Sequence, residues 1–253
     1  MRKEISPELL KNLYWEKAMS QTEIAELLSV SKQAVSLWMI QLQIPRRNQA
    51  EATSLAERNS LALTDEAIEF LEGCLLGDGS ISMNKSISAL YQHCDKHLSF
   101  LIWLRKKLAL FGIKTTKRIN TRSLEYKGKS YLAYRLTSLS YPELVILRKR
   151  WYPKGKKVIP RDLLLTPVRL LMWYLGDGSY RERRTRGREV RLCSTSFSME
   201  EKSLCALQLS RLGILTTTGP HGLRVRNSCI DNFFDFIGPC PVPEIYGYKW
   251  PSG

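Results

Sequence analysis

The sequence LEGCLLGDGS at residues 71–80 has a second copy, LLMWYLGDGS, at residues 170–179. Each copy closes an apolar stretch with helical spacing, so we expect two similar helices with Asp78 and Asp177 at their C-terminal ends. A carboxylate is destabilised there by the negative end of the helix dipole unless a cation lies beside it. A single copy would be explained by a helix stop and a turn, but duplication favours a pair of related acidic sites.

The sequence around the two copies repeats as well. Thr64 and Thr166 are favoured N-cap residues in front of the two predicted helices. Further along, LFGIKTT at residues 110–116 corresponds to RLGILTT at residues 211–217, each closing a second predicted helix before a strand region. The chain from about residue 61 therefore consists of two halves with one plan.

These paired motifs resemble those of the LAGLIDADG homing endonucleases, in the monomeric form that carries both motifs on one polypeptide. The likeness spans residues 61–251, with Met172 standing where the second motif would have its first glycine. It implies an α/β fold of the α+β type, built about a pseudo-twofold axis. Two central helices would pack side by side, and two antiparallel sheets would form a saddle over DNA.

The resemblance also implies the chemistry of the two acids. In that family the last acid of each motif binds divalent cations at the scissile phosphates, so Asp78 and Asp177 are expected to bind metal. Mg²⁺ prefers carboxylate, phosphate and water oxygens, and we expect Mn²⁺ to substitute for it. Such a cation polarises a phosphodiester and activates an attacking water.

Three further active-site residues are implied by position. Lys157 before Ile-Pro and Lys249 before Trp-Pro correspond to the basic residue of each half-site. Gln92 corresponds to a polar residue that organises active-site water, and Thr195 is expected as its counterpart in the second half.

The charge of the chain favours a nucleic-acid partner. The 253 residues include 39 Lys and Arg against 24 Asp and Glu, a formal charge of +15. Basic residues concentrate in predicted strands, where they alternate with apolar ones and can form a DNA-facing surface rather than a merely solvated one. The expected DNA-binding residues of this part are Lys117, Arg118, Arg135, Arg181, Arg183, Arg191, Arg224 and Arg226.

The N-terminal segment is expected to form a separate helical unit. Ser20-Gln-Thr-Glu is a capping box, and Ser31 can cap a second helix after a short turn at Ser29. This arrangement resembles a helix-turn-helix, although glycine is usual in the turn. Its residues facing the DNA major groove would be Lys32, Gln33 and Ser36. Small three-helix units also serve as protein docking modules, and that alternative remains open.

The predicted domains follow from these assignments. Residues 1–47 would form the helix-turn-helix domain and residues 48–60 a polar linker. Residues 61–160 and 161–253 would form the first and second LAGLIDADG half-domains.

The cysteines and the absence of targeting signals suggest an intracellular protein. The six cysteines form no Cys-x-x-Cys pair, so reduced thiols are expected. A zinc site can be imagined at His93, Cys94 and His97. However, Asp95 is expected to begin a helix that would separate the two histidines. We expect a location at DNA in a prokaryotic cytoplasm or an organelle, with no membrane partner and no secretion.

These inferences favour a site-specific double-strand DNA endonuclease of the homing type, acting as a monomer on a long target site. Two alternatives use the same scaffold. One is a catalytically inactive DNA-binding regulator, whose signature would be loss of the acids. The other is a maturase that binds intron RNA.

Overall fold

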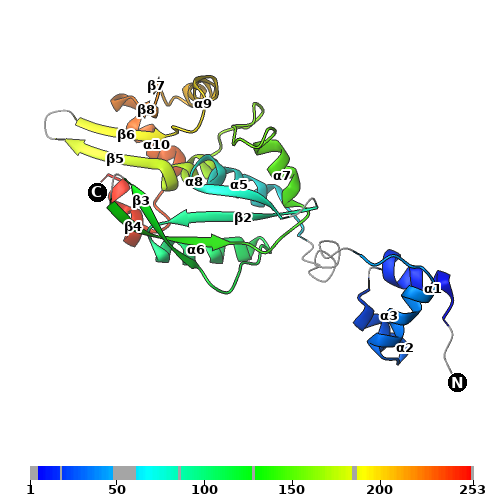
Figure 1. The fold of residues 1–253 in the computed structure, drawn as a ribbon. Coiled ribbons are helices and arrows are strands. Elements are labelled where there is room, and N and C mark those ends of the chain that lie inside the picture. The colour runs from blue at the N-terminus through cyan, green and yellow to red at the C-terminus, as the bar shows by residue number, and fades with distance from the viewer. Residues whose placement is uncertain are drawn as a thin grey trace. The chain divides into compact units, whose positions relative to one another are not determined.

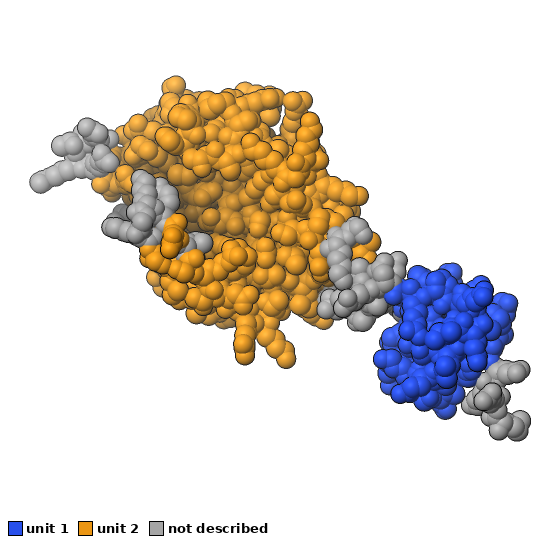
Figure 2. Space-filling model, viewed as in Figure 1, with its two compact units in different colours: residues 1–59 blue, residues 60–253 orange. Residues whose placement is uncertain are grey.

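The structure is a computed structural model. It describes residues 5–17, 19–47, 61–84, 87–126, 129–183 and 187–251. The chain divides into two compact units, residues 1–59 and 60–253 (Figure 2). The expected linker, residues 48–60, lies outside the described residues. Among the helices that the structure describes, none has both the length and the apolar character required to cross a bilayer.

The described part of the first unit contains helices and no strand. Its elements are α1 (Pro7–Lys11), a π-helical turn η1 (Asn12–Glu16), α2 (Gln21–Leu28) and α3 (Lys32–Gln41). Leu10, Ile24, Val35 and Met39 lie in a core of its own, with at most 1% of each residue exposed. A separate core allows this unit to fold independently of the second unit.

The ends of α2 and α3 follow from local sequence. Ser20 and Glu23 form the expected capping box, and the Ser31 hydroxyl caps α3. Ser29 ends α2 in the left-handed region at φ 54°, where a residue other than glycine is strained. The turn therefore has the backbone conformation for which glycine is usual.

The second unit repeats one series of elements. Its first half contains α5 (Asp65–Leu76), β1 (Gly79–Asn84), β2 (Ser88–Asp95), α6 (Leu98–Leu110), β3 (Asn120–Tyr126), β4 (Lys129–Thr137) and α7 (Leu144–Trp151). Its second half contains α8 (Pro167–Asp177), β5 (Gly178–Arg183), β6 (Gly187–Cys193), α9 (Met199–Arg211), β7 (Thr216–Gly219), β8 (Gly222–Val225), η2 (Asn227–Cys229) and α10 (Ile230–Ile237). A short C-terminal segment adds α11 (Pro243–Tyr246) and η3 (Gly247–Lys249).

Each half contains one four-stranded antiparallel sheet. The strand order is β1-β2-β4-β3 in the first half and β5-β6-β8-β7 in the second, so the two topologies are equivalent (Figure 1). Helices α6 and α7 pack on the first sheet, and α9 and α10 pack on the second. The expected α+β fold with two antiparallel sheets and paired helices is confirmed.

The helices α5 and α8 lie side by side between the two sheets (Figure 1). A Cβ atom at Gly73 would lie 2.8 Å from the Cα of Arg169 and 2.9 Å from the Cβ of Met172. Met172 therefore packs over Gly73, and a glycine on only one of the two helices is enough for their close approach at this level. One turn further, a Cβ at Gly77 would lie 3.5 Å from the Cα of Gly176. These close approaches bring the C-terminal ends of the two helices together.

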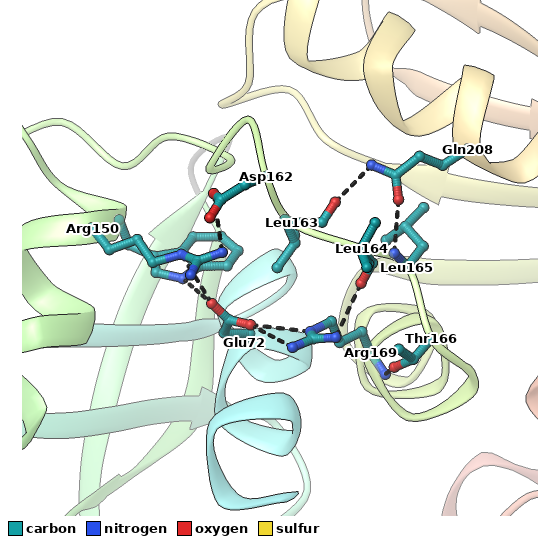
Figure 3. Close-up of polar contacts among 10 residues, drawn as sticks. Glu72, Arg150, Asp162, Leu163, Leu164, Leu165, Thr166, Arg169 and Gln208 are labelled. Atoms are coloured by element: carbon teal, nitrogen blue, oxygen red, sulfur yellow. Dashed lines mark hydrogen bonds and ion pairs between the residues drawn. The ribbon is translucent and has the colours of Figure 1, made fainter. Parts of the chain in front are cut away.

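A buried ionic cluster joins the halves nearer the start of α8 (Figure 3). Glu72 of α5 is fully buried, and its Oε2 accepts from Nε (3.0 Å) and Nη2 (2.8 Å) of Arg169 in α8. Its Oε1 accepts from the Trp151 indole at 3.3 Å and forms an ion pair with Arg150 at 3.3 Å. A buried carboxylate is tolerated only when such partners compensate its lost hydration. Glu72 thus fixes the relation of the two halves.

Candidate active site

The two motif acids lie where the paired helices end and the sheets begin. Gly77 is the C-cap of α5, with Asp78 following it directly before β1, and Asp177 is the last residue of α8 before β5. A Cβ at Gly176 would lie 3.3 Å from Oδ2 of Asp78. The absence of a side chain at Gly176 therefore allows Asp78 to lie against the end of α8 that carries Asp177.

The surroundings favour the neutral form of both acids. Burial and, to a smaller extent, the charge of Asp78 raise the pKa of Asp177 to about 7, although the positive charges of Lys157 and Lys249 oppose the rise. Burial also raises the pKa of Asp78, as does the neighbouring charge of Asp95. A divalent cation would relieve this crowding of negative charge.

The two predicted lysines lie at the same helix ends. Nζ of Lys157 donates to the carbonyls of Gly77 (2.9 Å) and Gly79 (2.8 Å), and Nζ of Lys249 donates to the carbonyl of Leu175 (2.6 Å). Burial lowers the pKa of Lys157 to about 8 and also lowers the pKa of Lys249. Each lysine thus satisfies carbonyls left over at a helix end and supplies positive charge beside an acid.

The sheet register corrects one predicted equivalence. Gln92 lies opposite Ser80 on β1, and Arg191 lies opposite Ser179 on β5. Arg191 is therefore the counterpart of Gln92, and the expectation of Thr195 was wrong, because Thr195 follows the end of β6. The position held by a neutral amide in the first half carries a guanidinium in the second.

A second group of polar side chains joins Asp78 in the first half. Asp78, His93 and Asp95 each offer a ligand atom, and these atoms lie within 4.8 Å of one another. Burial lowers the pKa of His93 to about 3, so its imidazole is neutral at neutral pH. His93 and Asp95 lie two residues apart on β2, and this spacing in the sequence indicates that they share one face of the strand. The sequence does not indicate that they approach Asp78.

This group differs from the zinc site considered above. Among the described residues, the only metal-compatible cluster of His, Cys, Asp and Glu excludes Cys94 and His97. Helix α6 begins at Leu98 with His97 as its N-cap, and the Asp95 carboxylate accepts from the His97 backbone at 2.6 Å. Asp95 therefore precedes the cap and is not itself the first residue of the helix.

A cleft of about 550 Å³ opens beside the acids. Its lining includes Asp78, Asp95, Lys249 and the aromatic residues Tyr180 and Tyr246. The C-terminal segment contributes two of these residues, and the hydroxyl of Tyr246 donates to Asp95. The first half-site is thus completed by residues from the end of the chain.

The predicted basic residues of the second sheet lie largely on its exposed face. Arg191 on β6 lies opposite Arg224 on β8, and both are exposed, whereas their neighbours in the strands are buried. Glu189 accepts from Arg191 at 2.8 Å and forms an ion pair with Arg224 at 2.9 Å. Arg181 and Arg226 are exposed, and the side chain of Arg183 lies outside the described part of the chain.

The remaining predicted contacts occupy other surfaces. Lys117 and Arg118 are exposed before β3, while Arg135 on β4 is half-buried and its Nε donates to Cys94 at 3.3 Å. In the first unit, Lys32 and Gln33 are exposed at the start of α3. Ser36 is half-buried, and its hydroxyl accepts from Arg46 at 2.6 Å, so it is already engaged.

Two known proteins are similar in sequence to this chain over part of their length. The cytochrome b mRNA maturase bI2 of Debaryomyces hansenii is 28% identical over 163 residues, which are 61% of this chain and 60% of the maturase. A RecA protein of Mycobacterium shimoidei is 34% identical over 142 residues, which are 53% of this chain and 30% of that protein. The chain thus spans less than two thirds of either relative.

A solved structure shares the fold. The homing endonuclease I-WcaI, bound to its DNA recognition sequence, superposes with a TM-score of 0.69 and 16% identity, covering 83% of this chain and 97% of that one. Residues 68–212 match the LAGLIDADG DNA endonuclease family, which is more than half of the chain. Both motif acids and Lys157 lie within this segment. The chain therefore belongs to the LAGLIDADG DNA endonuclease family.

Proposed function

We propose that the chain is a site-specific DNA endonuclease that hydrolyses a phosphodiester bond on each strand of a duplex with divalent metal ions. The observation that carries the proposal is the meeting of Asp78 and Asp177 at adjacent helix ends, each with a lysine that donates to the carbonyls of its helix end. A protein that bound DNA without cutting it would have no use for two adjacent carboxylates facing a polyanion.

The residues fit a hard divalent cation. Burial and a neighbouring carboxylate raise the pKa of each of the two acids, and a bound cation would stabilise their charged forms. Mg²⁺ and Mn²⁺ accept such oxygen ligands. When bound, the metal lowers the pKa of water and stabilises charge on the phosphoryl oxygens. We assign Asp78 and Asp177 as its ligands.

The chain's own residues supply the remaining chemistry. Lys157 and Lys249 place positive charge beside the acids, where negative charge develops as a phosphodiester bond breaks. Gln92 accepts from Ser82 at 3.5 Å and is placed to orient water in the first half-site, and Arg191 occupies its position in the second. Arg224 and the other exposed basic residues would bind phosphates and base edges.

The first unit extends this proposal. Its capped helices α2 and α3 and the strained turn between them suit a helix-turn-helix, with Lys32 and Gln33 directed at DNA. Tethered to the second unit, it would lengthen the recognised site. The two half-sites on one chain suggest action as a monomer, at DNA within the cell.

A direct test combines selection with substitution. The purified chain would be incubated with a randomised duplex library in Mg²⁺ or in Ca²⁺, and the ends produced would be sequenced. We expect ends that share one long motif in Mg²⁺. Asp78→Asn and Asp177→Asn should each retain DNA binding and lose double-strand cleavage by at least about 100-fold, since a metal ligand is lost. Undiminished cutting by both variants would defeat the proposal.

A matched control is available on the surface. Asp235→Asn makes the same change at an exposed position of α10 and should leave both binding and cleavage unaltered. If Asp235→Asn also abolished cleavage, the effect of the other variants could not be assigned to the acids.

Maturase activity is a second candidate, favoured by the similarity to a cytochrome b mRNA maturase. The basic surfaces that suit DNA would also bind a structured RNA. Affinity for structured intron RNA would be compared with affinity for duplex DNA at one salt concentration. Tighter RNA binding with no cut ends in the library would replace the endonuclease proposal with the maturase.

A further inference from the structure

The first half-site contains a buried histidine ring nitrogen without a partner. His93 is only 2% exposed, and its Nδ1 lies 2.8 Å from the hydroxyl of Tyr91. Its Nε2 is buried without a hydrogen-bond partner. An unsatisfied buried polar atom is costly, and a water or an ion is a common partner for one in a folded protein.

The hydrogen bonds around His93 suit a metal ligand. The Tyr91 hydroxyl also bonds the thiol of Cys74, so it can donate to sulfur and accept from Nδ1–H of His93. A metal-binding histidine commonly donates its second ring nitrogen in this way, which fixes the tautomer that exposes Nε2. Tyr91 is therefore placed to orient the ring.

Asp95 is held in position by two donors. One carboxylate oxygen accepts from the His97 backbone at 2.6 Å and the other accepts from the Tyr246 hydroxyl. Each oxygen keeps a further lone pair, because a carboxylate has about four acceptor sites. The carboxylate can thus bind a cation without losing either contact.

The spacing of the three groups fits a small divalent ion. Their ligand atoms lie within 4.8 Å of one another. Metal–ligand bonds of about 2.1 Å place atoms on opposite sides of an ion roughly 4.2 Å apart and adjacent ones closer. Small side-chain rotations would close the remaining difference.

Among the residues that the structure describes, the second half-site has no such group. Leu192 lies opposite Gly178, as His93 lies opposite Gly79, and Ser194 stands two residues later, as Asp95 does. The pseudo-twofold relation therefore breaks at the two positions that would supplement the motif acid. At these two positions Asp177 is supplemented by neither a histidine nor a second acid.

We propose that Asp78, His93 and Asp95 form a three-ligand site that binds one divalent transition-metal ion in the absence of DNA, and that the two half-sites are consequently unequal. One nitrogen and two carboxylate ligands favour Mn²⁺ or Zn²⁺ over Mg²⁺ and Ca²⁺, which prefer oxygen alone. The half-site of Asp78 is occupied first. On the proposed endonuclease function, it cuts its strand first when metal is limiting.

Direct binding tests the site without reference to cleavage. Mn²⁺ would be titrated into the full chain without DNA, and free Mn²⁺ measured by electron paramagnetic resonance. We expect one tight equivalent, displaced by Zn²⁺. His93→Leu, which introduces the residue of the second half, and Asp95→Asn should each weaken binding by at least about tenfold. Tyr91→Phe should weaken it by roughly tenfold through loss of the orienting hydroxyl.

The control variant is His221→Leu, the same substitution at an exposed histidine between β7 and β8, which should keep full affinity. Circular dichroism would verify that each variant is folded. The amide oxygen of Asp95→Asn can still accept from the His97 backbone, and its amide nitrogen can donate to the Tyr246 hydroxyl. This variant therefore keeps the proposal testable if His93→Leu does not fold. No tight Mn²⁺ equivalent in the folded wild-type chain, or equal affinity in His93→Leu, would overturn the site.

The order in which the two DNA strands are cut tests whether the half-sites are unequal. A target duplex labelled on either strand would be cut at limiting Mn²⁺, and we expect the wild type to nick one strand several-fold faster. His93→Leu should bring the two rates within about twofold. Equal nicking rates on the two strands by the wild type would refute the inequality of the half-sites. Tight Mn²⁺ binding without any cleavage would instead refute the endonuclease function and leave the proposed metal site intact.

Discussion

At the scale of single residues, the candidate site depends on groups whose ionisation is altered by their surroundings. Asp177 ends α8, where burial and the charge of Asp78 raise its pKa to about 7. Lys157 shows the opposite effect, because burial lowers its pKa to about 8. Acids and lysines with displaced pKa values that lie close together are typical of sites that bind metal or move protons.

The shift at Asp177 predicts a pH-dependent stability of the metal-free protein. Between pH 4 and 7 the folded state holds a proton that the unfolded state has released, since an unfolded aspartate has a pKa of about 3.9. The contribution of Asp177 is thus present at low pH and is lost as the pH rises toward 7. Lys157 is protonated in both states over this window and adds no slope.

Urea unfolding in EDTA at several pH values would measure this effect. The free energy of unfolding of the wild type, less that of Asp177→Asn, should fall from pH 4 to pH 7, and millimolar Mn²⁺ should restore it at pH 7. Parallel curves for the two proteins would show that the pKa of Asp177 is not raised.

At the scale of elements, the packing of α5 on α8 decides whether the two acids meet. The Cα of Arg169 and the Cβ of Met172 fill the space above Gly73, while the buried Glu72 ties α5 to Arg169. Replacing glycine within a helix by alanine ordinarily adds about 1 kcal/mol of stability through helix propensity. At this contact the clash opposes that gain.

Gly73→Ala is therefore expected to destabilise the second unit. Its Cβ would lie 2.8 Å from a backbone atom that cannot rotate away, and overpacking of this kind costs about 1 to 3 kcal/mol. Gly77→Ala is the control, because its Cβ would meet Gly176 at an ordinary 3.5 Å. Thermal denaturation would compare them, and a higher melting temperature for Gly73→Ala would mean that the helices separate without cost.

At the scale of the whole molecule, two units with separate cores share one chain. The first unit presents Lys32 and Gln33, and the second presents the paired acids and the exposed arginines. Because tethered modules raise each other's effective concentration on a common ligand, their affinities reinforce one another. The expected role of the first unit is in binding rather than in chemistry.

Deleting residues 1–59 should weaken specific DNA binding by at least tenfold, roughly the minimum expected when a tethered second module is lost. Single-turnover cleavage at saturating protein should be unchanged, because the acids and lysines all lie in the second unit. Affinity by fluorescence anisotropy and the cleavage rate would be measured at one ionic strength. Loss of cleavage at saturation would show that the first unit also acts in the chemistry.

The sequence by itself determined the elements that local chemistry specifies. The duplicated motif predicted two helices ending at Asp78 and Asp177, and the structure has both. Thr64 and Thr166 cap these helices, as expected from their hydroxyls. Strand alternation predicted the outward face of Arg224. Such features depend on residues within a turn or two of one another, so they can be inferred from the sequence alone.

The tertiary structure alone decided which distant residues meet. Strand alternation shows which face a side chain occupies but not what lies opposite, so Arg191 was not recognised as the counterpart of Gln92. The contact of Tyr246 with Asp95 joins residues 151 positions apart, and His93 meets Asp78 only because β2 pairs with β1 in this register. Non-local pairing and close packing arise from the fold as a whole, and they bring His93 and Asp95 to Asp78.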